Sequence, residues 1–332
     1  MPQLNPELTS NLNMQSFNLE FCGTKINIRS EHTFNLDNIY ELGKTVTGMS
    51  MQDDAISECE ADLTFIPHDD TEINYDESNK RMMLYGPLKH FGSGKAIIYT
   101  AGYIAECLRA AKQGPMLIHS AAVQSSEDSG SIVLLGEKGA GKTTLALRLC
   151  HEFGHRLIGN DNVFLGSNSD SKLITMGGNA WFDVRSTAVS ADKYLEKIVD
   201  DFDSQEPAWN KKVRIEPEDV DIDVCSEESL VRSIYHIRID HSQDMIYTNE
   251  WSGMQRHLLL HERFGRHITG QATPFQDDQG NYLGSLPSVN LSEAILGRDA
   301  LVKQVVNHGI TEIFAPNSSE ALNYIIESDV SL

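Results

Sequence analysis

One stretch, Gly136–Thr143, constrains the fold of this chain more than any other, because it has the pattern G-x-x-x-x-G-K-[ST] of a phosphate-cradling loop. A short apolar run, Ser131–Leu135, precedes it, and a segment of helical composition, 144–150, follows it. We therefore expect a buried strand, a glycine-rich turn and a helix in direct succession. Glycine permits the positive φ angles that such a turn needs, and the loop has three: Gly136, Gly139 and Gly141.

Each residue type in this loop has a physical role in binding an anion. The N-terminus of the following helix offers free N–H groups and the positive end of its dipole. Lys142 adds a charge for the β- and γ-phosphates, and Thr143 offers a hydroxyl to Mg²⁺. The sequence thus predicts an ATP site with Mg²⁺ as its second cofactor, built from Gly136, Gly139, Ala140, Gly141, Lys142, Thr143 and Thr144.

Length and composition favour a globular protein of more than one unit. The chain has 332 residues, of which 40% are hydrophobic and 23% charged. No apolar run is long enough for a transmembrane helix, and the N-terminus lacks the basic and apolar regions of a signal peptide. The five cysteines are scattered and form no C-x-x-C pair, which favours reduced thiols and a cytoplasmic location.

The formal net charge of -21 narrows the choice of partners. It argues against a nucleic-acid backbone or an anionic membrane as the main partner, because both repel an acidic protein. It also means that a bound polyphosphate needs local positive charge together with a metal ion.

The pattern along the chain predicts an α/β protein with two parts. Residues 1–95 should form a β-rich N-terminal module, because they contain a series of alternating runs at 17–21, 24–28, 62–66, 71–75 and 81–85. Residues 96–332 should form an α/β domain built around the P-loop. Its expected strands are 116–123, 131–135, two short runs within 157–165, 172–175, 181–185, 233–239 and 311–314. Its expected helices are 96–112, 144–150, 191–199, 255–266, 291–306 and 318–326, with an acidic connection at 200–230 and a mobile loop at 269–288.

Three segments in a fixed order carry a resemblance to a known family. They are Ile118-His-Ser-Ala-Ala-Val123, the loop Leu135–Thr144, and Leu157-Ile-Gly-Asn-Asp-Asn-Val163. Together they resemble the core of the HPr kinase/phosphorylase family, which is related in fold to the ATP-dependent phosphoenolpyruvate carboxykinases. Members of that family have a His after a strand, then a P-loop, then an acidic pair in a D-D-x-V setting. The resemblance covers residues 113–185.

The resemblance implies a role for several residues and also has gaps. Lys142 and Thr143 would hold phosphate and Mg²⁺, His119 would lie near the phosphates, and Asp161 would be the second acid of the pair, bound to the metal. Asn160 stands where the family has its first acid, the usual base toward the acceptor, so base chemistry passes to Asp161 or to no residue. The Arg-Gly-x-Gly signature has only an echo in Asp183-Val-Arg185. The phosphorylase reaction and HPr as acceptor therefore lack support.

Other interpretations of these residues stay open. Asp161 is also a plausible turn residue between strands, and Asp240, after the run 233–239, is a competing acid for the metal. His119 could be an ordinary buried histidine. Arg185 could neutralise charge on the γ-phosphate as a catalytic residue, or form a surface ion pair.

A group of cations at 256–267 is unusual in so acidic a chain. Of these, Arg263 and Arg266 are candidates for binding ATP phosphates. The spacing of His257 and His261 would also suit two metal ligands on one helix face.

The sequence therefore predicts an ATP-dependent kinase of the HPr kinase/carboxykinase type. The catalytic candidates are Lys142, Asp161, His119 and Arg185, and the acceptor is a hydroxyl of a small molecule or a Ser/Thr side chain of a peptide or protein. One alternative is an ATP-binding switch or scaffold that transfers no group, and another is a carboxykinase-like enzyme. The family resemblance also implies possible homo-oligomers.

Overall fold

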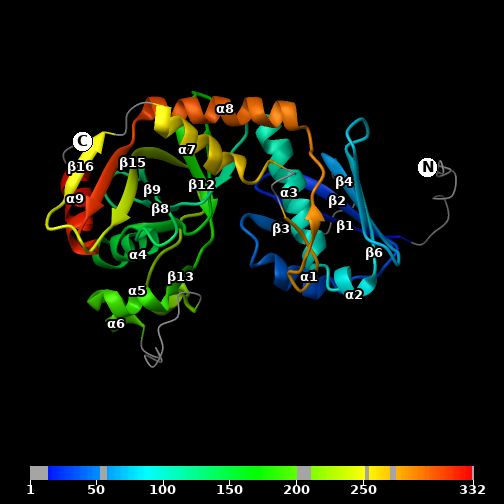
Figure 1. Ribbon diagram of the computed structural model, residues 1–332, viewed down its shortest axis with the longest axis horizontal. Coiled ribbons are helices and arrows are strands. Elements are labelled where there is room, and N and C mark those ends of the chain that lie inside the picture. Colours follow the sequence, from blue (N-terminus) through cyan, green and yellow to red (C-terminus); the bar gives the residue numbers. More distant parts are fainter. Residues whose placement is uncertain (1–13, 53–57, 200–210, 251–253, 270–273, 331–332) are drawn as a thin grey trace. The chain divides into compact units, whose positions relative to one another are not determined.

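The computed structural model describes residues 14–52, 58–199, 211–250, 254–269 and 274–330. The chain divides into two compact units, Met1–Lys112 with Gly265–Leu296, and Gln113–Phe264 with Gly297–Leu332. Figure 1 labels many of the helices and strands of both units. The first unit thus extends past residue 95, where we expected the N-terminal module to end, and includes a segment from much later in the chain.

The first unit contains a mixed sheet of six strands in the order β3-β1-β2-β4-β6-β5. The two pairs that β4 forms, with β2 and with β6, are parallel, and the outer pairs are antiparallel. The strands are β1 (Gln15–Phe21), β2 (Thr24–Ser30), β3 (Met49–Gln52), β4 (Ala61–Pro67), β5 (Glu72–Asp76) and β6 (Arg81–Gly86). The five strands expected from alternation in this region are therefore confirmed.

A tight turn joins β1 to β2, as the sequence predicts. Cys22 and Gly23 both have positive φ, 48° and 82°, which is the backbone of the two-residue hairpin turn whose twist matches the strands.

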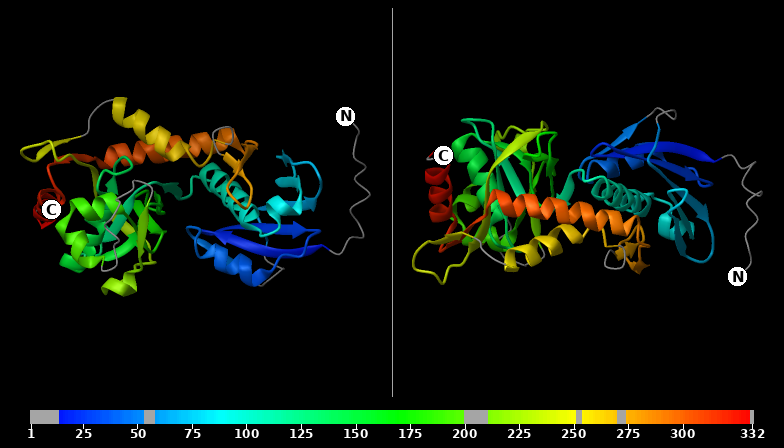
Figure 2. Two further views of the ribbon diagram at one scale, coloured as in Figure 1. Left: turned by 60° about the horizontal axis from the view of Figure 1, so that its bottom comes forward. Right: turned by 90° about the horizontal axis from the view of Figure 1, so that it is seen from above.

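Helices cover this sheet, so the unit is less purely β than its sequence indicates. The helix α3 (Lys95–Ala111) lies against β1, β2 and β4, as Figure 2 shows. Its inner face buries Ile97, Ile104 and Leu108. Two shorter helices, α1 (Leu36–Gly43) and α2 (Leu88–Phe91), contact α3.

The segment expected to be a mobile loop, 269–288, contains a hairpin, β17 (Pro274–Gln276) with β18 (Tyr282–Ser285). Residues 270–273 lie outside the described residues. The turn is ordered by the Asp277 carboxylate, which accepts hydrogen bonds from the backbone of Gln279 (3.0 Å) and Asn281 (2.8 Å). Phe275 stacks on Phe91 with ring centroids 5.8 Å apart. The expectation of a loop is wrong here because the polar residues build a turn rather than a linker.

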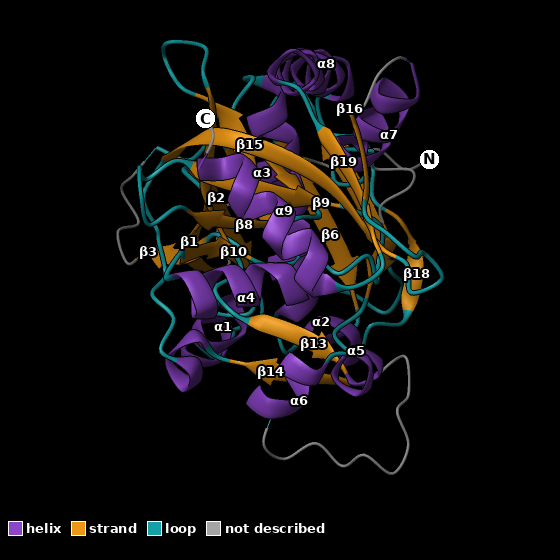
Figure 3. Ribbon diagram, turned by 90° about the vertical axis from the view of Figure 1, so that its left-hand side faces the viewer, coloured by secondary structure: helices purple, strands orange, loops and turns teal. Residues whose placement is uncertain are grey.

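The second unit is built on a curled sheet of nine strands with the path β10-β8-β9-β15-β12-β11-β7. In addition, β19 pairs with β15, and β16 pairs with β19. Figure 3 shows β15 (Ser229–Ile239) crossing this sheet as a long curved strand. Its first residues pair with β12, and its later residues pair in parallel with both β9 and β19. The other strands are β7 (Met116–Ile118), β8 (Ala121–Gln124), β9 (Ser131–Leu135), β10 (Arg156–Gly159), β11 (Val163–Ser167), β12 (Leu173–Gly178), β16 (Tyr247–Glu250) and β19 (Thr311–Ala315).

Two strand interruptions face each other in this sheet. The single strand expected at 116–123 is broken after Ile118, so that β7 pairs with β11 while β8 pairs with β9 and β10. The two short runs expected within 157–165 are confirmed as β10 and β11, with the link 160–162 between them. The link at His119–Ser120 therefore lies beside the link at 160–162.

Helices α4 (Lys142–Phe153) and α9 (Ser318–Val330) pack against each other and against the strands. A two-stranded ribbon, β13 (Phe182–Arg185) with β14 (Lys212–Ile215), contacts α4. The helix expected at 191–199 is confirmed as α6 (Lys193–Ile198), which Asp192 caps, and a further short helix, α5 (Ser186–Ala191), precedes it. The remaining elements are α7 (Met254–Gly265), α8 (Leu291–His308) and a short 3₁₀ turn at Pro217–Val220, within the acidic connection.

None of the helices in the described residues has both the length and the apolar character that crossing a membrane requires.

The fold of the first unit makes one prediction about stability. Asp278 follows β17, and its carboxylate accepts from the backbone N–H groups of Ser93 (2.7 Å) and Ala96 (2.9 Å) at the start of α3. We expect Asp278→Ala to lower the free energy of unfolding by about 1 to 2 kcal/mol, because it leaves orphan donors at a helix N-terminus. Urea denaturation followed by circular dichroism measures this, with the exposed Asp69→Ala as control. Equal stability of the two variants would contradict the capping role.

Candidate functional site

The glycine-rich loop has the geometry that its sequence predicts. It leaves the end of β9 at Leu135 and enters α4 at Lys142. Gly139 and Gly141 have positive φ, 86° and 100°. A side chain at Gly141 would also place its Cβ 2.6 Å from Ile239 Cγ1. Both backbone freedom and close packing therefore require glycine at position 141.

Lys142 is buried and its ammonium lies against its own loop. Its Nζ donates to the carbonyl oxygens of Gly136 and Glu137, each at 3.0 Å, and lies 3.3 Å from His119 Nε2. Burial, followed by the nearby charge of Arg263, lowers the pKa of Lys142 to about 8. The side chain is therefore still charged at neutral pH.

His119 occupies the interruption between β7 and β8 and connects two parts of the site. Its Nδ1 donates to the backbone carbonyl of Asp161 at 2.7 Å, which leaves the lone pair of Nε2 facing Lys142. Burial, and then the charge of Lys142, lowers the pKa of His119 to about 4. A neutral imidazole at this point orients Lys142 and the Asp161 backbone, and at neutral pH it is not in the imidazolium form that would act as a general acid.

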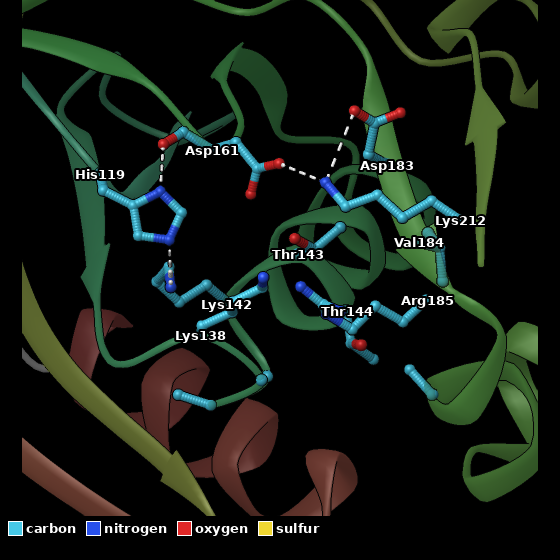
Figure 4. A pocket seen from close by; sticks show the side chains of 14 residues that line it. His119, Lys138, Lys142, Thr143, Thr144, Asp161, Asp183, Val184, Arg185 and Lys212 are labelled. Carbon is cyan, nitrogen blue, oxygen red and sulfur yellow. Dashed lines mark hydrogen bonds and ion pairs between the residues drawn. The ribbon is translucent and has the colours of Figure 1, made fainter. Parts of the chain in front are cut away.

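Asp161 lies in the interruption between β10 and β11 with a φ of 64°, which is uncommon outside glycine and asparagine. One carboxylate oxygen is 3.4 Å from Lys212 Nζ, and the same Nζ is 3.8 Å from Asp183 Oδ2. Figure 4 shows these groups around the start of α4. Asp161 is thus a turn residue whose side chain also faces the loop.

Asn160, in the family position of the first acid, is placed differently. It is 1% exposed, it does not line the pocket, and its side-chain oxygen and nitrogen have no hydrogen-bond partner in the described part of the chain. A carboxylate at this buried position would be an unpaired charge, which is far more costly than an amide.

Lys142, His119 and Asp161 line a pocket of about 150 Å³. Its lining is His119, Lys138, Gly139, Ala140, Gly141, Lys142, Thr143, Thr144, Asp161, Asp183, Val184, Arg185, Ala188 and Lys212. Lysine and arginine outnumber the acids here, although the whole chain carries a net charge of -21. The pocket therefore provides the local positive charge that an anion requires in such an acidic protein.

Lys212 is a site residue that the sequence did not indicate. It reaches the pocket because β14 pairs with β13 in a register that sets Lys212 opposite Arg185. That pairing joins residues on either side of a segment, 200–210, that lies outside the described residues. Only the alternating pattern of 212–215 could have indicated a strand there.

The two arginines proposed from the segment 256–267, Arg263 and Arg266, do not line the pocket. Arg263 is 4% exposed and donates to the carbonyl of Gly136 (2.9 Å) and the carboxylate of Glu137 (2.7 Å), so it holds the loop. Its charge, after burial, also helps to lower the pKa of the buried His236 to about 4. Arg266 falls within the first compact unit.

Asp240, the competing acid for the metal, and the histidine pair His257 and His261 do not line the pocket. Asp240 is outside the pocket lining, and its carboxylate accepts from the backbone (3.1 Å) and hydroxyl (2.6 Å) of Ser242, as a turn cap does. His261 lies 3.3 Å from Asp299. Across the described ranges, no three His, Cys, Asp or Glu residues gather as a set of metal ligands.

No protein-family model matches this chain, and a search among curated proteins finds no match either.

The buried histidines predict a sensitivity to acid. The pKa values of His119 and His236 are about 4, below the ordinary 6.5, so between these values the unfolded chain binds protons that the folded chain does not. The free energy of unfolding should therefore fall as the pH drops from 6.5 toward 4.

We expect His119→Gln to remove its share of this slope, about 1 kcal/mol per pH unit at most. Urea unfolding across pH 5 to 7 measures it, with His257→Gln on α7 as the control. Parallel slopes for wild type and His119→Gln would contradict a neutral, buried His119.

Proposed function

We propose that the second unit is an ATP-dependent kinase, which transfers the γ-phosphoryl group to a hydroxyl of a small molecule or of a Ser/Thr side chain. The observation that carries the proposal is the shared pocket of the glycine-rich loop, His119 and Asp161. These groups come from separate segments of the chain, and two facing strand interruptions bring them together. A glycine-rich turn that served only as a connection would not require this convergence.

Binding would use the loop and the first turn of α4. Backbone N–H groups of the loop and of the helix N-terminus would cradle the phosphates. Lys142 would exchange its hydrogen bonds to Gly136 and Glu137 for phosphate oxygens.

The donor set fits Mg²⁺ bound together with a nucleotide. Thr143 and Asp161 both line the pocket, and Mg²⁺ in proteins is commonly held by one or two such oxygen ligands plus substrate phosphates and water. The metal would neutralise charge on the transferring group. The absence of a ligand cluster made by the protein alone, within the described residues, agrees with a metal that arrives with its nucleotide.

Transfer would depend on positioning and charge. Arg185 and Lys212 lie at the pocket and would neutralise charge that develops on the phosphoryl oxygens. Asp161 would hold the metal or orient the acceptor hydroxyl. Because the transition state of phosphoryl transfer is loose, the hydroxyl proton need not be removed early, so Asn160 does not exclude the reaction.

The arrangement also supports the finer fold assignment, the HPr kinase/carboxykinase type, as part of this proposal. A curled mixed sheet carries the loop, and His119 and Asp161 stand around it in the order and spacing of that family's motifs.

An ATP-binding switch without transfer is the second candidate. The observation that favours it is the pairing of Asp161 with Lys212, together with an amide at position 160. A carboxylate engaged by Lys212 is occupied by a cation rather than by an acceptor hydroxyl, and the amide of Asn160 cannot take up a proton.

Two substitutions separate these functions. We expect Lys142→Ala to weaken Mg-ATP binding about a hundredfold, since charge-assisted hydrogen bonds to phosphate are lost. Asp161→Asn should bind nucleotide but slow transfer by about a hundredfold or more. Calorimetry and an acceptor screen for a mass gain of one phosphate measure these effects, with the exposed Lys172→Ala as control.

Three outcomes of this experiment are informative. Unchanged affinity in Lys142→Ala would contradict nucleotide binding at the loop. Binding without turnover on any acceptor would favour the switch. Transfer that survives in Asp161→Asn would contradict the assigned role of that carboxylate.

The lowered pKa of Lys142 gives a second prediction. With a pKa of about 8, Lys142 is mostly deprotonated at pH 9 in the free protein, and bound phosphate raises its pKa. Nucleotide binding at pH 9 should therefore take up about one proton. Calorimetry in two buffers of different ionisation enthalpy measures the uptake. Lys142→Arg, which stays charged, should abolish it, and equal uptake in that variant would assign the proton to another group.

A further inference from the structure

A second, larger pocket adjoins the first within the same unit. Its volume is about 690 Å³. The two pockets have Gly139, Gly141, Thr144, Arg185 and Ala188 in common. The larger one continues along α4 to Arg148 and Glu152, and it extends to α6 and to the start of α9. Figure 3 shows α4 with α9, α5 and α6 around it.

The two pockets are lined by different residues of the glycine-rich loop and of the first turn of α4. This difference indicates which end of a bound triphosphate would lie in which pocket. Lys142 and Thr143, which serve the γ-phosphate and its metal in such loops, line only the smaller pocket, as does Asp161. The shared residues include Gly139 and Gly141 of the backbone cradle for the α- and β-phosphates, together with Thr144. A triphosphate must therefore have its γ end in the smaller pocket and its α end at the junction, which directs whatever is attached to the α-phosphate into the larger pocket.

The walls of the larger pocket are fixed by hydrogen bonds among its own residues. Arg148 donates to the hydroxyls of Ser318 and Ser319, both at 2.9 Å, and to Glu152. Ser318 donates in turn to Asp192, which caps α6. These bonds join α4, α6 and α9 before any ligand enters, so little ordering is needed on binding.

The larger pocket offers both apolar and polar contacts. The Tyr194 ring lies beneath the Arg148 guanidinium at 5.0 Å, and Ile239 adds an aliphatic surface. Hydroxyls of Thr187 and Ser319 line the same space. Most of the other side chains that line it are polar or charged, and its volume lies within the range of about 300–1,000 Å³ that is usual for sites of small organic ligands.

We propose that the larger pocket holds the nucleoside of a nucleoside triphosphate, while the smaller pocket holds only the terminal phosphate and metal. The proposal rests on the function proposed above and adds the direction of the ligand. It also leaves the rim of the smaller pocket, at Asp183 and Lys212, as the side from which the acceptor approaches. Arg185, the charged residue that lines both pockets, is assigned to the phosphate chain at the junction.

The test compares Mg-ATP with Mg-tripolyphosphate, which has the same phosphate chain and no nucleoside. Thr187→Trp places a bulky side chain in the larger pocket alone. Ser190→Trp introduces the same group on the same helix, at an exposed position that lines neither pocket, and is the matched control. We expect Thr187→Trp to weaken Mg-ATP binding by about tenfold or more and to leave tripolyphosphate affinity within about twofold. Arg185→Ala should weaken both ligands.

Several results would overturn the proposal. Unchanged Mg-ATP affinity in Thr187→Trp means that the nucleoside lies elsewhere and that the larger pocket serves another ligand, such as the acceptor. If the wild-type protein bound tripolyphosphate as tightly as ATP, the nucleoside would contribute nothing to the affinity, which would contradict the proposal. A wild-type protein that binds neither ligand overturns this inference together with the proposed function, which distinguishes the two failures.

A second measurement needs no variant and so does not depend on how Thr187→Trp folds. Photolabelling of the wild-type protein with Mg-8-azido-ATP, whose reactive group is on the base, should mark peptides containing residues 187–197 or 317–319. Labelling confined to residues 161–183 or to Lys212 would reverse the assigned direction and overturn the proposal.

Discussion

The candidate site depends on one carbonyl oxygen. Gly136 O accepts from Lys142 at 3.0 Å and from Arg263 at 2.9 Å, so two buried cations converge on the first residue of the loop. Burial lowers the pKa values of Lys142 and His119, and the neighbouring positive charges lower them further. The arrangement is held by main-chain acceptors and by the carboxylate of Glu137. Lys142 and Arg263 therefore concentrate positive charge at the glycine-rich loop of a chain whose net charge is -21.

The curled sheet explains why the site lies where it does. In a continuous strand at 116–123, the side chain of His119 would be fixed on one face of the sheet by the alternation of the strand. Because β7 pairs with β11 while β8 pairs with β9, the chain leaves the strand conformation between them, and His119 lies in this link. The matching break before β11 releases Asp161, at a positive φ. The hydrogen bond between the two links then fixes one break against the other.

Local patterns determined most of what the sequence could predict. The strand, loop and helix around Gly136–Thr143, the hairpin at Cys22–Gly23 and the helices at α7, α8 and α9 follow from spacing and turn chemistry within a few residues. The placements of Lys212 and Arg263 depend on contacts across long sequence separations: a ribbon register in one case and a helix packed on the loop in the other. The hairpin at 274–285 was missed because its polar residues serve a turn that only the folded chain reveals.

The resting position of Lys142 has a consequence for selectivity. An incoming anion competes with two carbonyl oxygens that already accept from the ammonium group. A weakly charged solute, such as chloride or a simple carboxylate, gives little more than the interactions it displaces. Under the proposed function, a polyphosphate would contact the ammonium, the helix N-terminus and the cations that line the pocket at the same time. The loop would then select for densely charged anions before any other part of the solute is recognised.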